Sequence, residues 1–222
     1  MPPELIIFDC DGVLIDSEGI ASAVIADDLS RHGWPMTPSE SMEMFIGMSI
    51  IDMQPIIETR LGGELPEGWR HGLAQKLLIA LGEQAKIIPG AQEMLERTNA
   101  LGIPWRVASN SSDEEMAVKF ARTGLSALTA GRTHAAASII AKGGRPKPAP
   151  DIFLAAAHSA QILPQNCLVL EDSALGVTGA VAAGMICYGF APHGGGDHLI
   201  AAGASAVIHN LNDLFGVFGV LA

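Results

Sequence analysis

The chain contains few residues of the kinds that would point to nucleic-acid binding. Its 222 residues include only 13 lysines and arginines against 24 acidic residues, and the formal net charge is −11. Binding to a phosphate backbone needs clustered Lys and Arg, so this balance argues against nucleic acid as a partner. It does not exclude a small phosphorylated substrate, because a few cations or a metal ion can reverse the field inside one cleft.

Cysteine is also scarce. Cys10, Cys167 and Cys187 are odd in number and widely scattered, which does not fit a disulfide framework or a zinc site. Each of them lies in an apolar, strand-like segment. We therefore expect three buried free thiols.

Long apolar runs and targeting signals are missing as well. A membrane-spanning helix needs about 18 or more consecutive apolar residues, and the sequence has no such run. Residues 1–4 lack the basic region of a signal peptide, and the apolar run that follows them ends at Asp9. We expect a cytoplasmic protein with no membrane partner, as a monomer or a weak homodimer.

What the chain does have is enough apolar sequence, 49% of its residues, to build a packed core. Short, continuous apolar runs are typical of strands in a parallel sheet that is covered on both faces. Five such runs occur: Leu5–Phe8, Trp105–Ala108, Cys167–Leu170, Met185–Tyr188 and Ala206–Ile208. Helical segments separate them, one of them capped by Ser112 and ended by Gly124, another capped by Ser173. Strand alternating with helix predicts an α/β fold with a doubly wound, Rossmann-like parallel sheet.

Residues 16–88 interrupt this alternation, because they show helical patterns and no convincing strand. The expected helices are roughly Ser17–Arg31, a short helix after Thr37, one from about Ser49 to Leu61, and one from about Glu67 to Glu83. Pro55 should kink the third helix or move its start. We therefore expect an α/β core of residues 1–15 and 89–222, with an all-helical insert at residues 16–88.

Polar side chains that could carry chemistry follow the first predicted strand. Asp9 and Asp11 stand two residues apart at its end, and Gly12 comes next. In an open α/β sheet, ligands bind at the carboxyl ends of the strands. Two carboxylates at that place repel each other unless a cation or a proton lies between them. Taken alone, the motif also fits an ordinary solvated Asp-Gly turn.

Three further segments place polar groups at comparable positions. Ser109 and Asn110, before a helix N-terminus, can form a cradle for phosphate, although this pattern is also common in simple helix capping. Lys147 stands in a loop stiffened by three prolines. Glu171 and Asp172 end another apolar strand, and hard oxygen ligands from two strand ends suit Mg²⁺.

Together, these four motifs in this order resemble those of the haloacid dehalogenase (HAD) superfamily, which consists largely of phosphatases. The resemblance covers nearly the whole chain, and the helical insert lies where subfamily I of that superfamily has its C1-type cap. It implies that Asp9 is the nucleophile and that Asp11 is the general acid and base. It also implies that Ser109, Asn110, Lys147 and the N–H of Gly12 bind the phosphoryl group. Mg²⁺ would be held by Asp9, Asp11 (through its backbone carbonyl), Glu171 and Asp172.

The resemblance also bears on the reaction and the substrate. Dehalogenases of this superfamily lack an aspartate at the position of Asp11, which favours phosphoryl transfer here. The cap segment Phe45–Ile50 resembles that of β-phosphoglucomutases, but Ile46 and Ile50 replace the Lys and Arg that the mutases carry. We therefore expect a Mg²⁺-dependent phosphatase that forms an aspartyl-phosphate and acts on a sugar or polyol phosphate, for example 6-phosphogluconate.

Three alternatives remain open at this point. The first is a phosphomutase of the β-phosphoglucomutase type. The second is a phospho-accepting signalling protein like a response-regulator receiver domain, although those domains are shorter and have no helical insert. The third is a catalytically silent binding protein on the same fold.

Overall fold

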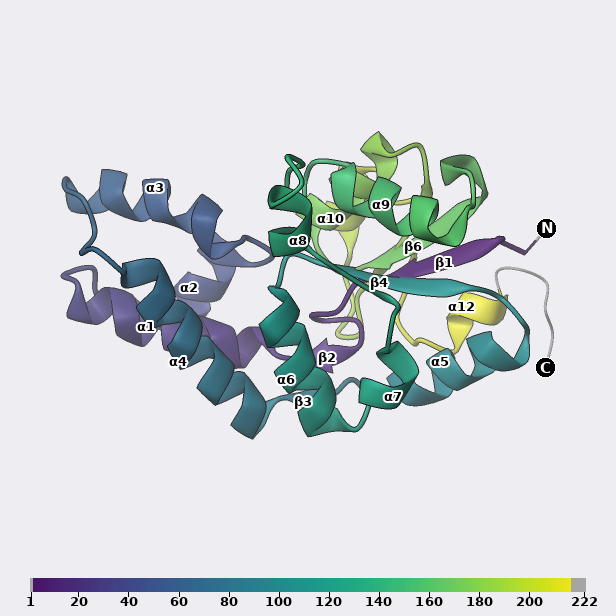
Figure 1. The fold of residues 1–222 in the computed structure, drawn as a ribbon, viewed down its shortest axis with the longest axis horizontal. Helices are drawn as coiled ribbons and strands as arrows, with labels where there is room; N and C mark the ends of the chain where they lie inside the picture. Colours follow the sequence, from purple (N-terminus) through teal and green to yellow (C-terminus); the bar gives the residue numbers. More distant parts are fainter. Residues whose placement is uncertain (1, 217–222) are drawn as a thin grey trace.

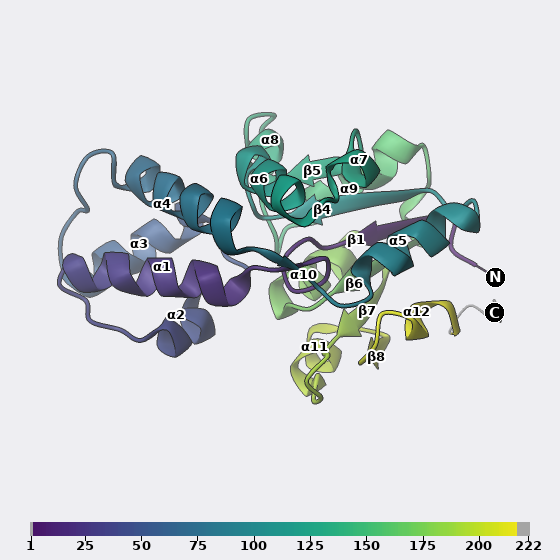
Figure 2. The same cartoon turned by 90° about the horizontal axis from the view of Figure 1, so that it is seen from below.

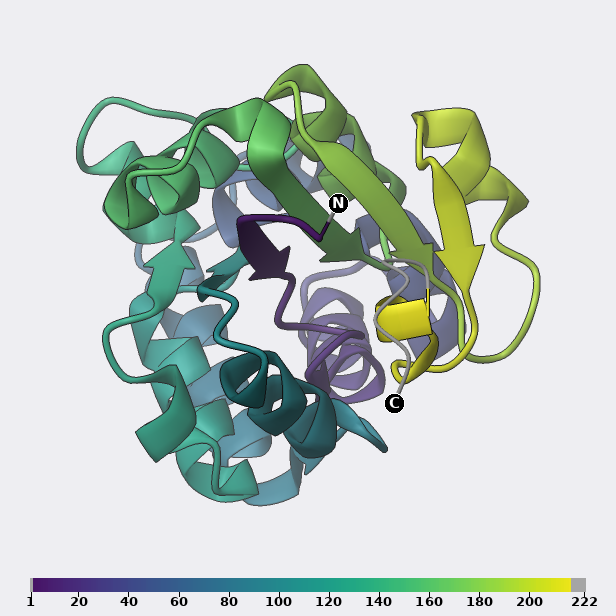
Figure 3. The ribbon, with the colours of Figure 1, turned by 90° about the vertical axis from the view of Figure 1, so that its right-hand side faces the viewer.

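The computed structural model describes residues 2–216, in which six parallel strands form the central sheet in the order β5-β4-β1-β6-β7-β8. The strands are β1 (Leu5–Phe8), β4 (Trp105–Ser109), β5 (Thr133–Ala135), β6 (Cys167–Glu171), β7 (Ile186–Phe190) and β8 (Ala206–Ile208). The yellow β8 forms one edge of the sheet (Figure 3). The predicted α/β fold with a doubly wound parallel sheet is confirmed. The edge strand β5 was not predicted, because its half-buried Thr133 and His134 interrupt any apolar run.

Helices cover both faces of this sheet (Figure 1). The larger ones are α5 (Ala91–Ala100), α6 (Asp113–Thr123), α9 (Asp151–Ala160) and α10 (Ala174–Ala182). The shorter ones are α7 (Ser126–Thr129), α8 (Ala136–Ile140), the 3-10 helix η1 (Pro164–Asn166), α11 (Asp197–Ala202) and α12 (Asp213–Gly216). Alternation along β1 sends Ile6 and Phe8 into one apolar cluster with α5 and α6, and Leu5 and Ile7 into another with α9 and α10.

Residues 16–88, which we call the cap, lie to one side of the sheet (Figures 1 and 2). Their helices are α1 (Glu18–Arg31), α2 (Pro38–Phe45), α3 (Ile50–Leu61) and α4 (Trp69–Gln84). They enclose an apolar cluster of their own, which includes Leu29, Ile57, Trp69 and Leu73. The cap therefore has a core of its own, and its α4 packs against α6 of the α/β core, where Val118 contacts the cap cluster.

The expectation that this segment holds helices alone is wrong at both of its ends. Strand β2 (Ile15–Asp16) pairs antiparallel with β3 (Lys86–Ile87), so the two connections between core and cap run side by side. Two-residue strands are too short to leave a periodic signal in the sequence. Pro55 lies inside α3 without moving its start, which directly follows the capping Ser49.

The expected buried thiols and the expected helix starts after Thr37 and Ser112 are observed. All three cysteines are buried and free. The Thr37 capping box forms, with the Glu40 N–H donating to Thr37 Oγ1 at 3.2 Å, and an equivalent box begins α6 at Ser112. No helix among residues 2–216 is long and apolar enough to cross a membrane.

Candidate active site

The carboxyl ends of three central strands bring the predicted polar residues together in one cavity. Asp9 and Asp11 follow β1, Ser109 and Asn110 come from the end of β4, and Asp172 follows β6. These residues line the cavity together with Lys147 and with side chains of the cap, and its volume is ≈ 130 Å³. Residues far apart in the chain therefore meet where a parallel sheet presents its ligand-binding edge.

Lys147 is the cation at the centre of the site. Its side chain is almost completely buried, and its Nζ donates hydrogen bonds to Asp9 Oδ1 at 2.5 Å, to Glu171 Oε1 at 2.5 Å and to the Ala108 carbonyl oxygen at 2.8 Å. All three protons of the ammonium group are thus used. One lysine holds two carboxylates from different strands in fixed positions.

Three carboxylates in this cluster form a potential metal site. Asp9, Glu171 and Asp172 each offer an oxygen, and these oxygens lie within 4.8 Å of one another. Burial, together with repulsion from Glu171, raises the pKa of Asp9 to about 8 in spite of the attraction of Lys147. Burial and neighbouring carboxylates also raise the pKa of Asp172 well above its usual value. Clustered hard oxygens with an excess of negative charge are a donor set that fits a divalent cation such as Mg²⁺.

Two glycines make room for these carboxylates. Gly12 has a φ of +76°, and a Cβ at this position would lie 1.7 Å from Asp172 Oδ2. A Cβ at Gly176 would lie 1.9 Å from the carboxyl group of Glu171. The N–H of Gly12 donates to the Ile15 carbonyl oxygen at 2.8 Å, so it is not directed at a phosphate in this structure. The predicted role of Gly12 in phosphate binding stays a prediction.

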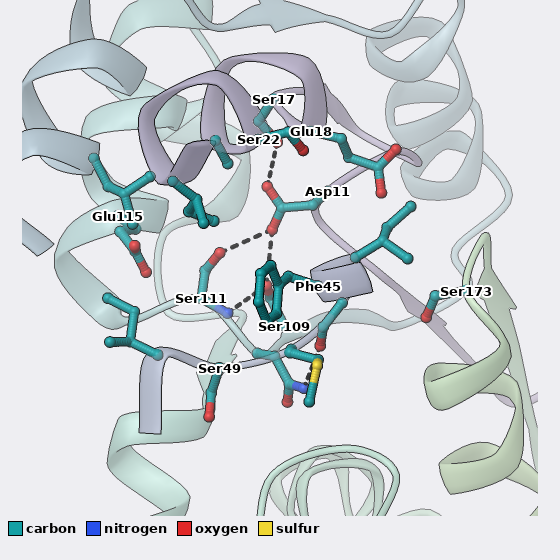
Figure 4. A pocket seen from close by; sticks show the side chains of 18 of the residues that line it. Asp11, Ser17, Glu18, Ser22, Phe45, Ser49, Ser109, Ser111, Glu115 and Ser173 are labelled. Carbon is teal, nitrogen blue, oxygen red and sulfur yellow. Dashed lines mark hydrogen bonds between the residues drawn. The ribbon is translucent and has the colours of Figure 1, made fainter. Parts of the chain in front are cut away.

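Asp11 is held by a dense set of donors (Figure 4). Lys119 Nζ donates to Oδ1 at 2.6 Å, and the hydroxyls of Ser111 and Ser109 donate to Oδ2 at 2.9 and 3.1 Å. The Ser17 hydroxyl also donates to Oδ1. Burial raises the pKa of Asp11, but attraction by Lys119 and these hydrogen bonds outweigh it and lower the pKa to about 2. Asp11 is therefore ionised in this arrangement.

The sequence analysis missed Lys119, Ser111 and Ser17 as parts of the site. Lys119 is completely buried, although it lies in a helix where most lysines would be solvated. A signal was present, since Lys119 stands three residues after the buried Met116 and directly before the buried Phe120, on the apolar face of α6. A lysine on such a face needs a buried acidic partner, and Asp11 is that partner.

Asn110 joins three segments through its amide. Its Nδ2 donates to the Gly47 carbonyl oxygen of the cap at 2.7 Å and to the Lys147 carbonyl oxygen at 3.2 Å, while Oδ1 accepts from the Lys147 N–H at 2.9 Å. Both ends of the side chain are thus engaged in positioning the Lys147 loop and the cap loop. The predicted contact of Asn110 with phosphate would have to come from its backbone.

The fold and this arrangement define a class of protein, a doubly wound α/β protein with carboxylates and a lysine clustered at the carboxyl edge of its sheet. A sequence profile of the haloacid dehalogenase-like hydrolase family matches residues 3–184. The chain therefore belongs to that family, as its four motifs indicated.

Named relatives agree with this assignment. Hexitol phosphatase A of Escherichia coli (strain K12) is 27% identical over 94% of this chain and 87% of its own length. The 6-phosphogluconate phosphatase of the same organism is 25% identical over 86% of this chain and 84% of its own length. A conserved haloacid dehalogenase-like protein of unknown function from Agrobacterium tumefaciens superposes with a TM-score of 0.80, at 35% identity and 97% coverage of both chains. The prediction of a phosphoric monoester hydrolase of this superfamily is confirmed.

Proposed function

We propose that the protein is a Mg²⁺-dependent phosphatase that passes the phosphoryl group of a small sugar or polyol phosphate through Asp9 to water. The observation that carries the proposal is the position of Asp9, whose Oδ1 accepts from Lys147 within the carboxylate cluster at the cavity. The two named relatives, which act on hexitol phosphate and 6-phosphogluconate by their names, support this substrate class. A cytoplasmic location is part of the same proposal.

In the first step, a carboxylate oxygen of Asp9 attacks phosphorus and the bond to the ester oxygen breaks. This forms an acyl-phosphate on Asp9 and releases the alcohol, whose oxygen takes a proton from Asp11. Ser109 and Lys147, which also line the cavity, would exchange present hydrogen bonds for bonds to the phosphoryl oxygens. When bound at Asp9, Glu171 and Asp172, Mg²⁺ would offset the repulsion between the nucleophile and the anionic substrate.

In the second step, water attacks the phosphorus of the acyl-phosphate, Asp11 takes up its proton, and the carboxylate of Asp9 is restored. The ionised Asp11 of this structure suits that second step. To act as the acid of the first step, Asp11 must bind a proton, which Lys119 opposes at a distance of 2.6 Å.

Hydrolysis rather than isomerisation is the outcome that we propose. A mutase must hold a second phosphate at the far end of its bisphosphate intermediate, which calls for a cationic clamp. In this chain, the cap contributes Ile46 and Ile50 to the lining of the cavity, and neither side chain can serve as such a clamp.

The direct test is the hydrolysis of acetyl phosphate and p-nitrophenyl phosphate by the purified full chain. The proposal expects release of inorganic phosphate with Mg²⁺ and no release in excess EDTA. An undiminished rate in excess EDTA would contradict it.

A further inference from the structure

The cap closes the cavity above Asp9 with an apolar wall. Its aliphatic, aromatic and thioether side chains come from all four cap helices and from the loop between α2 and α3. They include Ile25, Phe45, Met48, Ile50, Met53 and Leu77. A leaving group that extends from Asp9 toward the cap would contact these side chains.

No lysine or arginine in the lining is free to receive a second negative charge. The two cations there are Lys147, which pairs with Asp9 and Glu171, and Lys119, which pairs with Asp11. Each is already neutralised by a carboxylate at 2.5 or 2.6 Å. A carboxylate or a second phosphate on the substrate would lose its water here without gaining a partner, which is costly.

Two further carboxyl groups in the lining disfavour the binding of a second anionic group. Glu18, at the start of α1, and Glu115, on α6, both line the cavity (Figure 4). Glu115 accepts from the Ser112 N–H at 2.6 Å, so its position is fixed. The other side-chain polar groups on the cap side are the hydroxyls of Ser17, Ser22 and Ser49; Ser17 donates to Asp11, and Ser49 donates to Asp52 Oδ2 at 2.6 Å. Hydroxyls can bind an uncharged alcohol, but they cannot neutralise a charge.

The cavity is also compact. Its volume of ≈ 130 Å³ is close to that of an engineered protein cavity of about 150 Å³ that binds benzene. The phosphoryl group itself takes part of this space. What is left suits a short leaving group.

We propose that the leaving group of the natural substrate is a compact, uncharged alcohol that packs part of its carbon chain against the cap wall. This inference rests on the proposed phosphatase function and narrows its substrate class. Among the sugar and polyol phosphates, the inference favours phosphate esters of neutral polyols. It excludes phosphate esters that also carry a carboxylate, such as 6-phosphogluconate.

A matched pair of substrates tests the charge requirement. Glycerol 1-phosphate and 3-phosphoglycerate have the same three carbons and differ only in a terminal CH₂OH or carboxylate. With the full chain and Mg²⁺, we expect kcat/KM for glycerol 1-phosphate to be about 100-fold higher or more. Equal values for the two substrates would overturn the inference.

A second pair tests the apolar contact. Ethyl and butyl phosphate have leaving groups of almost equal acidity, so their chemical steps should match. Burial of the two extra methylenes should raise kcat/KM by about 15-fold for butyl phosphate. Equal values for the two esters would contradict contact with the wall.

Two neighbouring isoleucines provide a test with variants. Ile50 lines the cavity, whereas Ile51 is 48% exposed and lies outside it. We expect Ile50→Arg to reduce the preference for glycerol 1-phosphate over 3-phosphoglycerate at least tenfold, because it supplies the missing cation. Ile51→Arg should leave the preference unchanged. An unchanged preference in Ile50→Arg would overturn the placement of the leaving group.

Acetyl phosphate separates failure of this inference from failure of the proposed function. If it is hydrolysed with Mg²⁺ while neither substrate pair discriminates, the substrate class is wrong and the phosphatase function stands. If neither acetyl phosphate nor any ester is hydrolysed, both proposals fall together.

Discussion

The ammonium group of Lys119, which is completely buried in α6, donates a 2.6 Å hydrogen bond to Oδ1 of Asp11, 108 positions earlier in the chain. Lys119 also donates to the Ser111 hydroxyl at 2.8 Å. The ion pair links helix α6 to the loop after β1 and keeps Asp11 ionised. It gives the candidate acid and base a defined charge before any substrate arrives.

Replacement of Lys119 by Met should cost stability in a way that depends on pH. The pKa of Asp11, about 2 in the folded protein, lies below its unfolded value of about 3.9, so the pair stabilises the fold above pH 4 and is lost toward pH 2. In Lys119→Met, the serine hydroxyls alone oppose the effect of burial, and the pKa of Asp11 rises. We expect a loss of about 2 kcal/mol in the free energy of unfolding at pH 7.

At pH 4 the loss should be smaller, because Asp11 can then take up a proton. Urea denaturation at the two pH values measures both losses, and the exposed Lys142→Met serves as the control. An equal loss at pH 7 and pH 4 would show that Lys119 acts through packing alone.

Asp9→Asn should abolish turnover without unfolding the protein. An amide cannot form the acyl-phosphate, so we expect kcat to fall by at least about 10³-fold. The pKa of Asp9 is raised to about 8, which means that its ionised form costs stability, and asparagine removes that cost. The melting temperature measured without a divalent cation should therefore not fall. A near-wild-type rate would overturn the nucleophile assignment.

Mg²⁺ should raise the melting temperature of the wild-type protein. The ion offsets repulsion within the cluster of Asp9, Glu171 and Asp172, and binding at 100 times the Kd adds about 2.7 kcal/mol of stability. Asp172→Asn should lose most of this shift, as measured by differential scanning fluorimetry. Asp27→Asn, at an exposed position of α1, is the matched control and should keep it. A full shift in Asp172→Asn would place the ion elsewhere.

β-Glucose 1-phosphate should be hydrolysed or left unchanged, but not isomerised. The reason is the absence of a cation at Ile46 and Ile50, where the far phosphate of a bisphosphate intermediate would lie. The measurement is the formation of glucose 6-phosphate with glucose 1,6-bisphosphate as primer. Efficient formation of glucose 6-phosphate would reverse the ranking of phosphatase over mutase.

Much of the fold could be predicted from local sequence patterns. Buried strands such as β1 are continuous apolar runs. The capping box at Ser112 indicates where α6 begins, and Gly124 indicates where it ends. The edge strand β5 could not be predicted, because half-exposed polar residues fill it. The pairing of β2 with β3 depends on the meeting of two segments about 70 residues apart, which no local pattern records.

Site residues that directly follow strands could be predicted from the sequence. Site residues that reach the cavity only through the packing of helices could not. Asp9, Asp11 and Asp172 could be named because strand ends converge at one edge of a parallel sheet. Lys147 lies in the loop between α8 and α9 and was indicated by its proline-rich motif, not by a strand end. Lys119 reaches the site from the middle of a helix, and its partner becomes apparent only when α6 packs against the sheet. The apolar character of the cavity arises in the same way, from side chains of the four cap helices and of the loop between α2 and α3.

The central claim, transfer of the phosphoryl group to Asp9, is tested most directly by trapping the acyl-phosphate. The full chain would be mixed with acetyl phosphate and Mg²⁺, quenched in acid during turnover, digested and analysed by mass spectrometry. The account predicts the added mass of one phosphoryl group on the peptide that contains Asp9, at that residue, and its absence in Asp9→Asn. Phosphorylation of a different residue, or turnover by Asp9→Asn at the wild-type rate, would contradict it.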